Sequence, residues 1–438
     1  MLNYIDLFAG AGGLSEGFIK AGFTPVAHIE MDKNACLSLK TRISYHYLKS
    51  QDQLEIYYSY LRQNISQAEL YSHVPSHLLK SAIQAEISDL SIKNLFDRID
   101  NLLNGGKIDL IVGGPPCQAY SLVGRSKINS LGDQHVSTDI RYELYKQYGR
   151  FLQKYQPEYF VFENVLGLRS AEKGQLLLRI KKYFEKECGY KIDWRIVNAY
   201  EYGVLQLRKR IIIIGKRGLD PFEYPEFERV RRENSWNVKE SLFSDLEPLS
   251  VGEEKHYSLY KDLPVNSYLQ KHGIRSEVNF VTQHITRPHN SRDLAIYRLA
   301  IEKWEEGERL KYPDLPEELR THRNLTSFLD RYKVVDPDGL CHTVVAHIAR
   351  DGHYYIYPDK NQTRSLSVRE AARIQSFPDD YFFEGGRGAA FKQIGNAVPP
   401  QLAFVIARKM KELLLEKPVN EFYLHPYTTS PAESVGAH

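Results

Sequence analysis

Cysteine is scarce in this sequence of 438 residues, and the cysteines lie far from one another. Cys36, Cys117, Cys188 and Cys341 form no CxxC pair and no closely spaced cluster. Neither a disulfide framework nor a structural zinc site is therefore expected. The scarcity favours a protein of the reducing cytoplasm that carries no metal ion.

Long apolar runs and a strong charge are also missing. The chain opens as MLNYIDLF, without the basic start and apolar stretch of a secretory signal, and no run is long enough to span a bilayer. The net charge of +3 at pH 7 falls short of the strongly basic balance that would by itself indicate a nucleic-acid partner. We expect an intracellular protein without a membrane partner.

Short apolar runs alternate with helical patterns through the first half of the chain. This alternation is typical of an α/β fold with a mostly parallel sheet. The chain is long enough for a second domain. The expected strands are Tyr4–Phe8, Val26–Ile29, Leu110–Val112, Tyr159–Phe162 and Ile211–Ile214.

Changes in composition divide the chain further. Residues from about 39 to 103 have a roughly helical apolar spacing, which predicts a helical insertion. Prolines interrupt the polar, aromatic and basic segment 216–362, which predicts a separate loop-rich domain. Residues 417–438 lack apolar periodicity and are expected to form a flexible tail. The core domain would comprise residues 1–215 and 363–416.

Helical patterns return after Arg364. Ser367 and Glu370 have the spacing of a capping box, in which each side chain satisfies a free amide at a helix start. A second helix is expected from Gln401 to about Leu415, after two prolines.

A glycine-rich segment follows the first apolar run. Gly10 and Gly12 are followed by Ser15, where a dinucleotide-binding loop needs its third glycine, so a pyrophosphate ligand is disfavoured. Glu30 ends the second run, where a carboxylate in such folds accepts hydrogen bonds from ribose hydroxyls. An adenosine-containing cofactor fits this pattern.

Cys117 follows the third apolar run on the segment Gly-Gly-Pro-Pro-Cys. A cysteine is more often a buried structural residue than a reactive one. The two prolines stiffen this loop just beyond a strand, and such a loop presents a thiol instead of packing it. The context favours a nucleophile.

Two motifs resemble those of DNA (cytosine-5) methyltransferases of the bacterial type. GGPPCQAYS, which contains Cys117, is similar to their catalytic loop, and DLFAGAGG is similar to their cofactor loop. Four more blocks follow in the family's order: Glu163-Asn164-Val165, Gln206 to Arg210, Ser367 to Tyr381, and Gln393 to Val398. Six ordered blocks identify the chain as a member of this family, outside residues of about 39–103, 216–340 and the tail.

The resemblance implies a Rossmann-like core that uses S-adenosylmethionine, with 216–362 as the target-recognition domain. The implied reaction methylates carbon 5 of a cytosine flipped out of double-stranded DNA, after Cys117 has bonded to carbon 6. Glu163 would assist at ring nitrogen 3 if it holds a proton. Arg208 and Arg210, two residues apart, are expected to share a face, with Arg210 favoured as the contact to the base carbonyl.

The matching motifs also imply the remaining contacts. Residues expected at the cofactor are Phe8, Ala9, Gly10, Gly12, Glu30, Met31, Asp89, Pro116, Asn396 and Ala397. Residues expected at the DNA or the target base are Gln118, Tyr120 and Ser121 in a loop that closes over the base, with Asn164, Val165, Gln206 and Thr343. No motif indicates which residue is the base that removes the proton from carbon 5, and water could serve.

The recognition domain offers side chains that could reach phosphates or base edges. Most of them are expected to contact phosphates or solvent. They are Arg275, Arg287, His289, Asn290, Arg292, Arg320, His322, Arg323 and Asn324.

Three alternatives share parts of this pattern. A transfer-RNA methyltransferase is disfavoured because the Cys-Phe-Thr signature of that branch is absent. A catalytically silent DNA-binding relative would have lost the nucleophile or the cofactor loop. A nicotinamide-dependent oxidoreductase fails on glycine spacing. We expect a monomeric, nucleoid-associated enzyme, either solitary or the modification partner of a restriction endonuclease with which it forms no stable complex.

Overall fold

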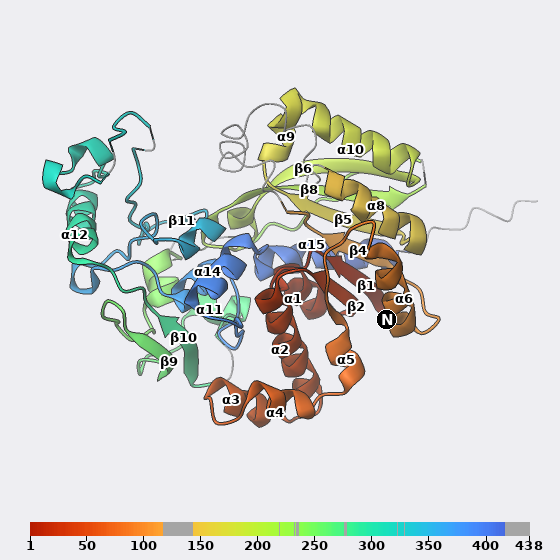
Figure 1. Ribbon diagram of the computed structural model, residues 1–438, viewed down its shortest axis with the longest axis horizontal. Coiled ribbons are helices and arrows are strands. Elements are labelled where there is room, and N and C mark those ends of the chain that lie inside the picture. The colour runs from red at the N-terminus through yellow and green to blue at the C-terminus, as the bar shows by residue number, and fades with distance from the viewer. Residues whose placement is uncertain are drawn as a thin grey trace, which may run out of the picture.

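The computed structural model describes residues 1–116 and 143–416, except 219, 232, 234–235, 276–277, 322 and 328. Seven of the described strands form a central sheet in the order β3-β2-β1-β4-β5-β8-β6 (Figure 1). They are β1 (Leu2–Leu7), β2 (Phe23–Glu30), β3 (Ala82–Gln84), β4 (Leu110–Gly113), β5 (Tyr159–Asn164), β6 (Tyr190–Asn198) and β8 (Lys209–Arg217). Strands β3 to β5 pair in parallel, and β8 runs antiparallel to both neighbours.

The five runs predicted as strands correspond to β1, β2, β4, β5 and β8, so the mostly parallel α/β sheet is confirmed. Strands β3 and β6 were not predicted. β3 has only three residues and lies within the segment expected to be a helical insertion. A run this short carries no readable periodicity.

Helices cover both faces of the sheet. Alternate residues of a strand point to opposite faces, so Ile5 and Leu7 of β1 pack with α6 (Ile92–Leu103), α8 (Leu144–Tyr155) and α10 (Gln175–Lys186). Tyr4 packs on the other face with α1 (Gly13–Lys20) and α15 (Pro400–Leu415). The predicted helix after the two prolines is thus α15.

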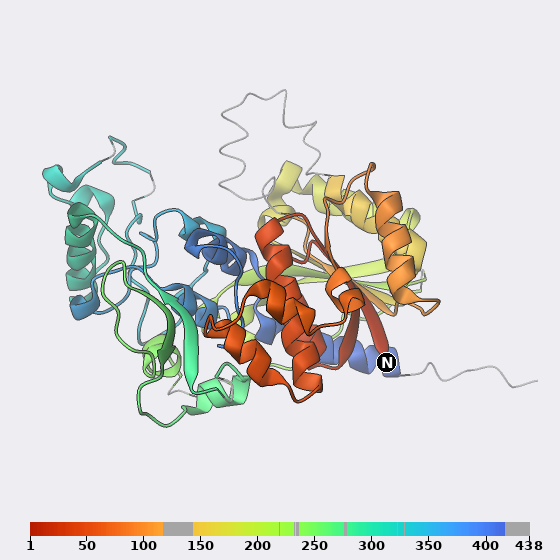
Figure 2. The same cartoon turned by 60° about the horizontal axis from the view of Figure 1, so that its bottom comes forward.

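The predicted insertion is helical apart from β3. Its helices are α2 (Lys33–Ser50), α3 (Leu54–Leu61), α4 (Gln67–Ser72), α5 (Ser76–Lys80) and α6. Asp32 caps α2 by accepting hydrogen bonds from the amides of Asn34 and Ala35. Helices α3 and α4 extend below the sheet toward the left-hand part of the molecule (Figures 1 and 2).

Residues 236–397 build this left-hand part, which we call the second lobe (Figure 2). Strands β9 (Glu254–Leu259) and β10 (Phe280–Ile285) pair in an antiparallel hairpin, and β11 (Cys341–His342) pairs with β7 (Gln206–Leu207) from outside the lobe. The lobe's helices are α11 (Ser267–His272), α12 (Ser291–Glu305), α13 (Val368–Ile374) and α14 (Arg387–Asn396). Long loops join these elements.

Helix α13 begins with the predicted capping box. The Ser367 hydroxyl accepts from the Glu370 amide, and the Glu370 carboxylate accepts from the Ser367 amide at 2.7 Å. Helices α13 and α14 share a hydrophobic cluster with Trp236, Leu242 and Val281 of the lobe. The domain limit at residue 362 therefore stays a prediction, since these two helices pack with residues on both sides of it.

Shorter turns complete the described chain. They are α9 (Gly167–Ser170), the π-helical turn η5 (Lys239–Phe243), and the 3-10 turns η3 (Ala171–Gly174), η4 (Ala199–Tyr202), η6 (Tyr312–Asp314), η7 (Glu317–Leu319), η8 (Ala346–Ala349) and η9 (Lys360–Gln362). No helix in the described part of the chain is both long and apolar enough to cross a membrane.

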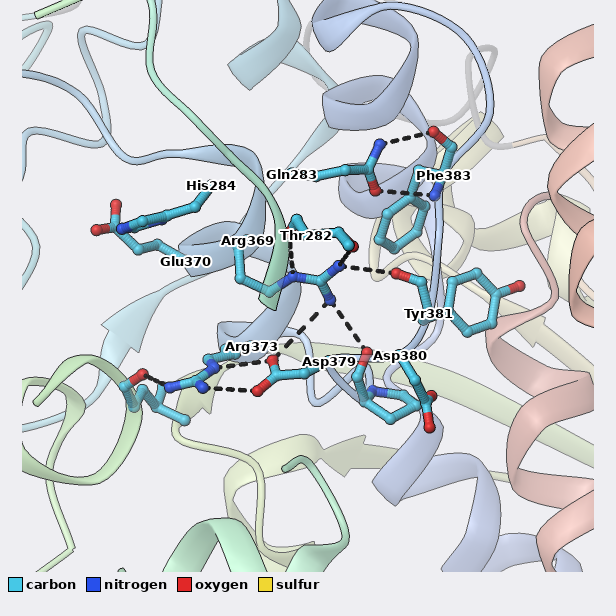
Figure 3. A network of polar contacts seen from close by, with 12 residues as sticks. Thr282, Gln283, His284, Arg369, Glu370, Arg373, Asp379, Asp380, Tyr381 and Phe383 are labelled. Carbon is cyan, nitrogen blue, oxygen red and sulfur yellow. Dashed lines mark hydrogen bonds and ion pairs between the residues drawn. The ribbon is translucent and has the colours of Figure 1, made fainter. Parts of the chain in front are cut away.

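Buried arginines fix α13 to the hairpin β9–β10 (Figure 3). Arg369, which is fully buried, donates to the carbonyl oxygens of Thr282 on β10 at 2.9 Å and of Tyr381 at 2.8 Å. Arg373 pairs with Asp379 at 2.6 Å. The Gln283 amide exchanges two hydrogen bonds with the Phe383 backbone, at 2.8 and 2.9 Å. Hairpin β9–β10 is thereby held against the chain that returns to the core.

Candidate active site

The loop after β1 has an unusual backbone conformation, and part of it is accessible to a ligand. Phe8, Gly10 and Gly12 all have positive φ, and such a conformation is strained for a residue as bulky as Phe8. A Cβ added at Gly10 would meet nothing within 4 Å, whereas one at Gly12 would lie 2.8 Å from Leu39 Cδ2. Gly10 therefore borders free space, while Gly12 is needed for packing.

Glu30 joins this loop to the end of β2. Its Oε2 accepts from the Gly10 amide at 2.8 Å, and its Oε1 accepts from the Asp32 amide at 2.7 Å. Burial raises the pKa of Glu30, against the effect of these backbone hydrogen bonds. Met31 beside it is 59% exposed. The predicted pair at the end of β2 thus consists of an anchored carboxylate and an accessible apolar side chain.

A buried carboxyl group lies in β1, just before this loop. Asp6 is fully buried, and its Oδ2 accepts from the Ser15 hydroxyl at 2.7 Å. Its Oδ1 has no hydrogen-bond partner in the described part of the chain. Burial raises the pKa of Asp6 to about 7. Asp6 was not among the predicted site residues, although it is the first residue of the segment DLFAGAGG.

The C-terminal block meets this loop from the other end of the chain. A Cβ on Gly13 would come within 2.2 Å of the Val398 carbonyl oxygen and 3.2 Å of Ala397 Cβ. Asn396 ends α14 with an exposed side chain. The hydroxyl of Tyr381, a further residue that the sequence analysis did not assign to this site, donates to the Ala11 carbonyl oxygen. The structure therefore brings both predicted halves of the cofactor site together.

Asp89 is the exception among the predicted cofactor residues. Its exposed carboxylate pairs with Arg150 of α8 and accepts from Gln147 at 3.1 Å. Both contacts involve Oδ1 of an exposed carboxylate, and the assignment of Asp89 to the cofactor site stays a prediction.

Glu163 and Arg210 form an ion pair at the carboxyl end of β5. The distance from Arg210 Nε to Glu163 Oε1 is 2.7 Å, and the side chains are 10% and 13% exposed. Strands β5 and β8, which carry them, are neighbours in the sheet. A Cβ on Gly114 would lie 2.6 Å from Glu163 Oε2. The pair is therefore packed against the segment that leads to Cys117.

Asn164 fixes the same segment. Its Nδ2 donates to the Pro115 carbonyl oxygen at 3.3 Å, while its Oδ1 accepts from the Val165 amide at 2.9 Å. Asn164 is buried and Val165 is half-buried. Cys117 itself, with Gln118, Tyr120 and Ser121, lies outside the described residues, so these four assignments rest on the sequence.

Arg208 does not share a face with Arg210, which corrects the expectation from their spacing. Arg208 lies between β7 and β8, where the backbone turns and the alternation of a single strand does not apply. The side chain is fully buried, and its guanidinium donates to the carbonyl oxygens of Val344, Gly395 and Ala397 at 2.6, 3.2 and 2.8 Å. Arg208 therefore joins the segment at Val344 to the end of α14, whereas Arg210 lies beside Glu163.

Gln206 also makes its hydrogen bonds to other protein groups. It is fully buried, its Nε2 donates to Gln375 Oε1 at 2.8 Å, and its Oε1 accepts from the Val344 amide at 2.9 Å. Thr343 is half-buried, and its hydroxyl donates to the Leu207 carbonyl oxygen. Of these two predicted base contacts, Thr343 alone retains an accessible surface.

Most donors named for the recognition domain bind other parts of the protein. Arg275 pairs with Asp245 at 3.2 Å, and Arg287 donates to the carbonyl oxygens of residues 348–350. His289, Asn290, Arg320 and Asn324 make hydrogen bonds to nearby protein groups. Arg292 and Arg323 are exposed. His322 lies outside the described residues. Asn290 and Asn324 are exposed as well, so the exposed donors of this set within the described residues are these two asparagines and two arginines.

Among the side chains that the structure describes, no group of three or more His, Cys, Asp or Glu residues is arranged to hold a metal ion.

Known proteins are similar to this chain in sequence and in fold. The sequence profile of C-5 cytosine-specific DNA methylases matches residues 2–60 and 68–412. The type II methyltransferase M.Bpa9945I of Bacillus paralicheniformis is 40% identical, over 94% of this chain and 98% of its own. M1.HphI of Haemophilus parahaemolyticus, also a type II methyltransferase, is 30% identical over 96% and 88% of the two chains.

A solved structure supports the fold assignment. It is the crystal structure of a prophage-encoded E. coli protein assigned as a DNA modification methyltransferase, with a TM-score of 0.58 and 24% identity over 94% of this chain and 99% of that one. The resemblance found in the motifs is confirmed by the profile match over nearly the whole sequence. The chain belongs to the C-5 cytosine-specific DNA methylase family and is a DNA (cytosine-5) methyltransferase.

Proposed function

We propose that this enzyme transfers the methyl group of S-adenosylmethionine to carbon 5 of a cytosine flipped out of a specific double-stranded DNA sequence, through a covalent adduct with Cys117. One observation carries the proposal. The Arg210–Glu163 ion pair, at 2.7 Å, lies against Gly114, three residues before Cys117. A guanidinium and a carboxyl group beside a thiol-bearing loop suit the polar edge of a cytosine ring.

Carbon 5 of cytosine is a poor nucleophile, so the Cys117 thiolate first forms a bond to carbon 6. The electron pair of the 5,6 double bond is then available at carbon 5, with part of the charge on the ring carbonyl and nitrogen 3. Arg210 stabilises the carbonyl oxygen, and Glu163 provides a hydrogen bond at nitrogen 3 when it holds a proton. The Arg210–Glu163 contact of the free protein would be exchanged for contacts to the base.

The later steps restore the ring. S-adenosylmethionine, when bound, would supply an electrophilic methyl group to carbon 5; its carbon–sulfur bond would break with the electron pair staying on sulfur, and S-adenosylhomocysteine would be the leaving group. A base, for which water is one candidate, then removes the proton from carbon 5, the electron pair re-forms the double bond, and Cys117 leaves as a thiolate. Residues Gln118, Tyr120 and Ser121 are proposed to close over the flipped base meanwhile.

The residues at the cofactor loop fit this cofactor. Gly10 borders free space, and the Glu30 carboxylate is held by two backbone amides while keeping lone pairs for ribose hydroxyls. Asn396 and Ala397 approach from the opposite side, with Phe8, Ala9, Met31 and Pro116 as the remaining proposed contacts. Asp6 has a buried oxygen without a partner in the described chain, which suits a nearby donor.

We propose double-stranded DNA as the substrate and a monomer as the working form, acting at the bacterial nucleoid. The type II names of the relatives support a role as the modification enzyme of a restriction-modification system. A solitary methyltransferase would use the same site. A transfer-RNA substrate and a silent DNA-binding role are the alternatives that the following experiment separates.

The test is expression in a host that lacks cytosine methylation, followed by mapping of 5-methylcytosine in DNA and RNA. We expect the modified base in one DNA sequence context, its loss in Cys117→Ala, and its retention in Cys188→Ala, the matched control at a half-buried cysteine. Methylation that persists in Cys117→Ala, or that appears only in RNA, contradicts the proposal.

A further inference from the structure

The backbone of Val344 is held from both sides by two side chains, one from Gln206 in β7 and one from Arg208, which follows β7. The Val344 amide donates to Gln206 Oε1 at 2.9 Å, and the Val344 carbonyl oxygen accepts from Arg208 Nη1 at 2.6 Å. Gln206, Arg208 and Val344 are all fully buried. Gln206 and Arg208 thus fix both the N–H and the C=O of Val344, which lies more than a hundred residues later in the sequence.

The residues beside Val344 are held as well. The Tyr355 hydroxyl donates to the Thr343 carbonyl oxygen and accepts from the Val345 amide, at 3.0 Å in each case. The backbone from Thr343 to Val345, which we call the strip, is therefore fixed by side chains at every residue. Val345 is 39% exposed, and Leu207, whose carbonyl oxygen accepts from the Thr343 hydroxyl, is 48% exposed. The strip and the neighbouring Leu207 therefore each offer an apolar side chain to the surface.

The same two side chains continue to the end of α14. Arg208 Nη2 donates to the carbonyl oxygens of Gly395 and Ala397 at 3.2 and 2.8 Å. Gln206 donates to Gln375, whose amide donates in turn to the Ile394 carbonyl oxygen at 2.6 Å. This is the end of α14 at which Asn396 and Ala397 are proposed to contact the cofactor.

The two backbones also touch directly. A Cβ on Gly395 would lie 2.3 Å from the Ala346 amide nitrogen, so only glycine permits this approach. Contacts made of buried backbone groups and a buried guanidinium resist independent movement of the parts, because each unpaired group would be left without water. The strip and the end of α14 should therefore shift together.

We propose that Arg208 and Gln206 are positioning residues that join the strip Thr343–Val345 to the end of α14, so that cofactor binding and DNA binding strengthen each other through this junction. The inference rests on the proposed function, since it takes the strip to face DNA and α14 to face the cofactor. Coupling of this kind is reciprocal. If the cofactor increases the affinity of the enzyme for DNA, bound DNA increases the affinity of the enzyme for the cofactor by the same factor.

The test measures the dissociation constant of a duplex carrying the mapped sequence, by fluorescence anisotropy, with and without saturating S-adenosylhomocysteine. In the wild type we expect S-adenosylhomocysteine to lower the dissociation constant of the duplex by about tenfold. Arg208→Lys, whose single ammonium cannot serve three carbonyl oxygens in a fixed geometry, should bring this factor close to one. Arg217→Lys, an exposed arginine at the far end of β8, should keep the wild-type factor.

Tyr355→Phe supplies a second variant, because it releases the strip without changing Arg208, and it should lower the coupling factor while the protein stays folded. A folded Arg208→Lys or Tyr355→Phe that keeps the full factor overturns the inference, as does a wild-type factor of one. Methylation of the duplex by the wild type is measured in parallel. If the wild type fails to methylate, the proposed function fails; if it methylates but coupling is unaffected by the variants, only the junction proposal fails.

Discussion

Arg210 and Glu163 neutralise each other before any substrate is present, with Nε and Oε1 2.7 Å apart. Each residue could be named from its motif, but their pairing could not, because it depends on strands β5 and β8 lying side by side. Arg208 shows the opposite case. Its spacing suggested a partner for Arg210, and the turn between β7 and β8 instead directs it to three backbone carbonyls.

Glu163→Gln should lower the rate of methyl transfer by about 100-fold to 1,000-fold, because the amide cannot donate a proton toward nitrogen 3 as a carboxyl group can. Glu158→Gln, at an exposed residue just before the same strand, is the control. Single-turnover transfer of a radiolabelled methyl group measures both. A Glu163→Gln rate close to that of the wild type would remove Glu163 from the reaction.

His284 should make the fold sensitive to acid. It is fully buried between the Ser367 hydroxyl and the Glu247 carbonyl oxygen, at 2.9 and 2.8 Å. Burial lowers the pKa of His284 from 6.5 to about 4. Between these two pH values His284 is protonated in the unfolded chain and neutral in the folded protein. Its contribution to stability is complete above pH 6.5 and is lost as the pH falls to about 4.

Urea denaturation at pH 7.5 and pH 5 measures this loss, which amounts to about 2 kcal/mol for His284 alone. His284→Gln should reduce the difference between the two pH values by that amount. His256→Gln, at an exposed histidine, should leave it unchanged. An unaltered difference in His284→Gln would show that the imidazole does not titrate as its burial requires.

At the scale of elements, α1 and α15 approach each other closely. A Cβ on Gly17 would lie 2.4 Å from the Phe404 nitrogen and 2.5 Å from Ala403 Cβ, so the helices touch through backbone. Glycine at this position was visible in the sequence, but its partner was not, because α15 returns from the far end of the chain. Sequence periodicity identified five strands and α15, whereas β3 was too short to detect.

Gly17→Ala should therefore destabilise the protein by about 1–3 kcal/mol, since the added methyl group forces two helices apart. Gly388→Ala in α14 is the matched control, because a Cβ there meets nothing within 4 Å and alanine favours a helix. Thermal denaturation compares the two. Equal stability of the variants would mean that the α1–α15 contact is looser than described.

At the scale of the whole molecule, the helical insertion connects the sheet to the second lobe. Arg42 of α2 donates to Glu16 of α1 and, at 2.8 Å, to Asp380 of the lobe. Tyr58 of α3 packs edge-on against Phe280 of β10, with ring centroids 6.0 Å apart. No sequence pattern predicts such contacts, because they join segments that only the completed fold brings together.

Arg42→Met should cost about 3–5 kcal/mol of stability, because it leaves two buried carboxylates without their cation. Arg179→Met removes an exposed pair with Glu172 and should cost less than about 1 kcal/mol. Denaturant titration gives both values. An Arg42→Met variant as stable as the control would mean that the insertion does not brace the lobe through this pair.

The most direct test of the covalent mechanism uses a duplex with 5-fluorocytosine at the target position. Fluorine replaces the proton that must leave carbon 5, so the elimination stalls and the adduct with the enzyme persists after methyl transfer. With S-adenosylmethionine present, mass spectrometry should find the modified nucleotide attached to the peptide that contains Cys117. An adduct at another residue, or none while the unmodified duplex is methylated normally, would contradict the account.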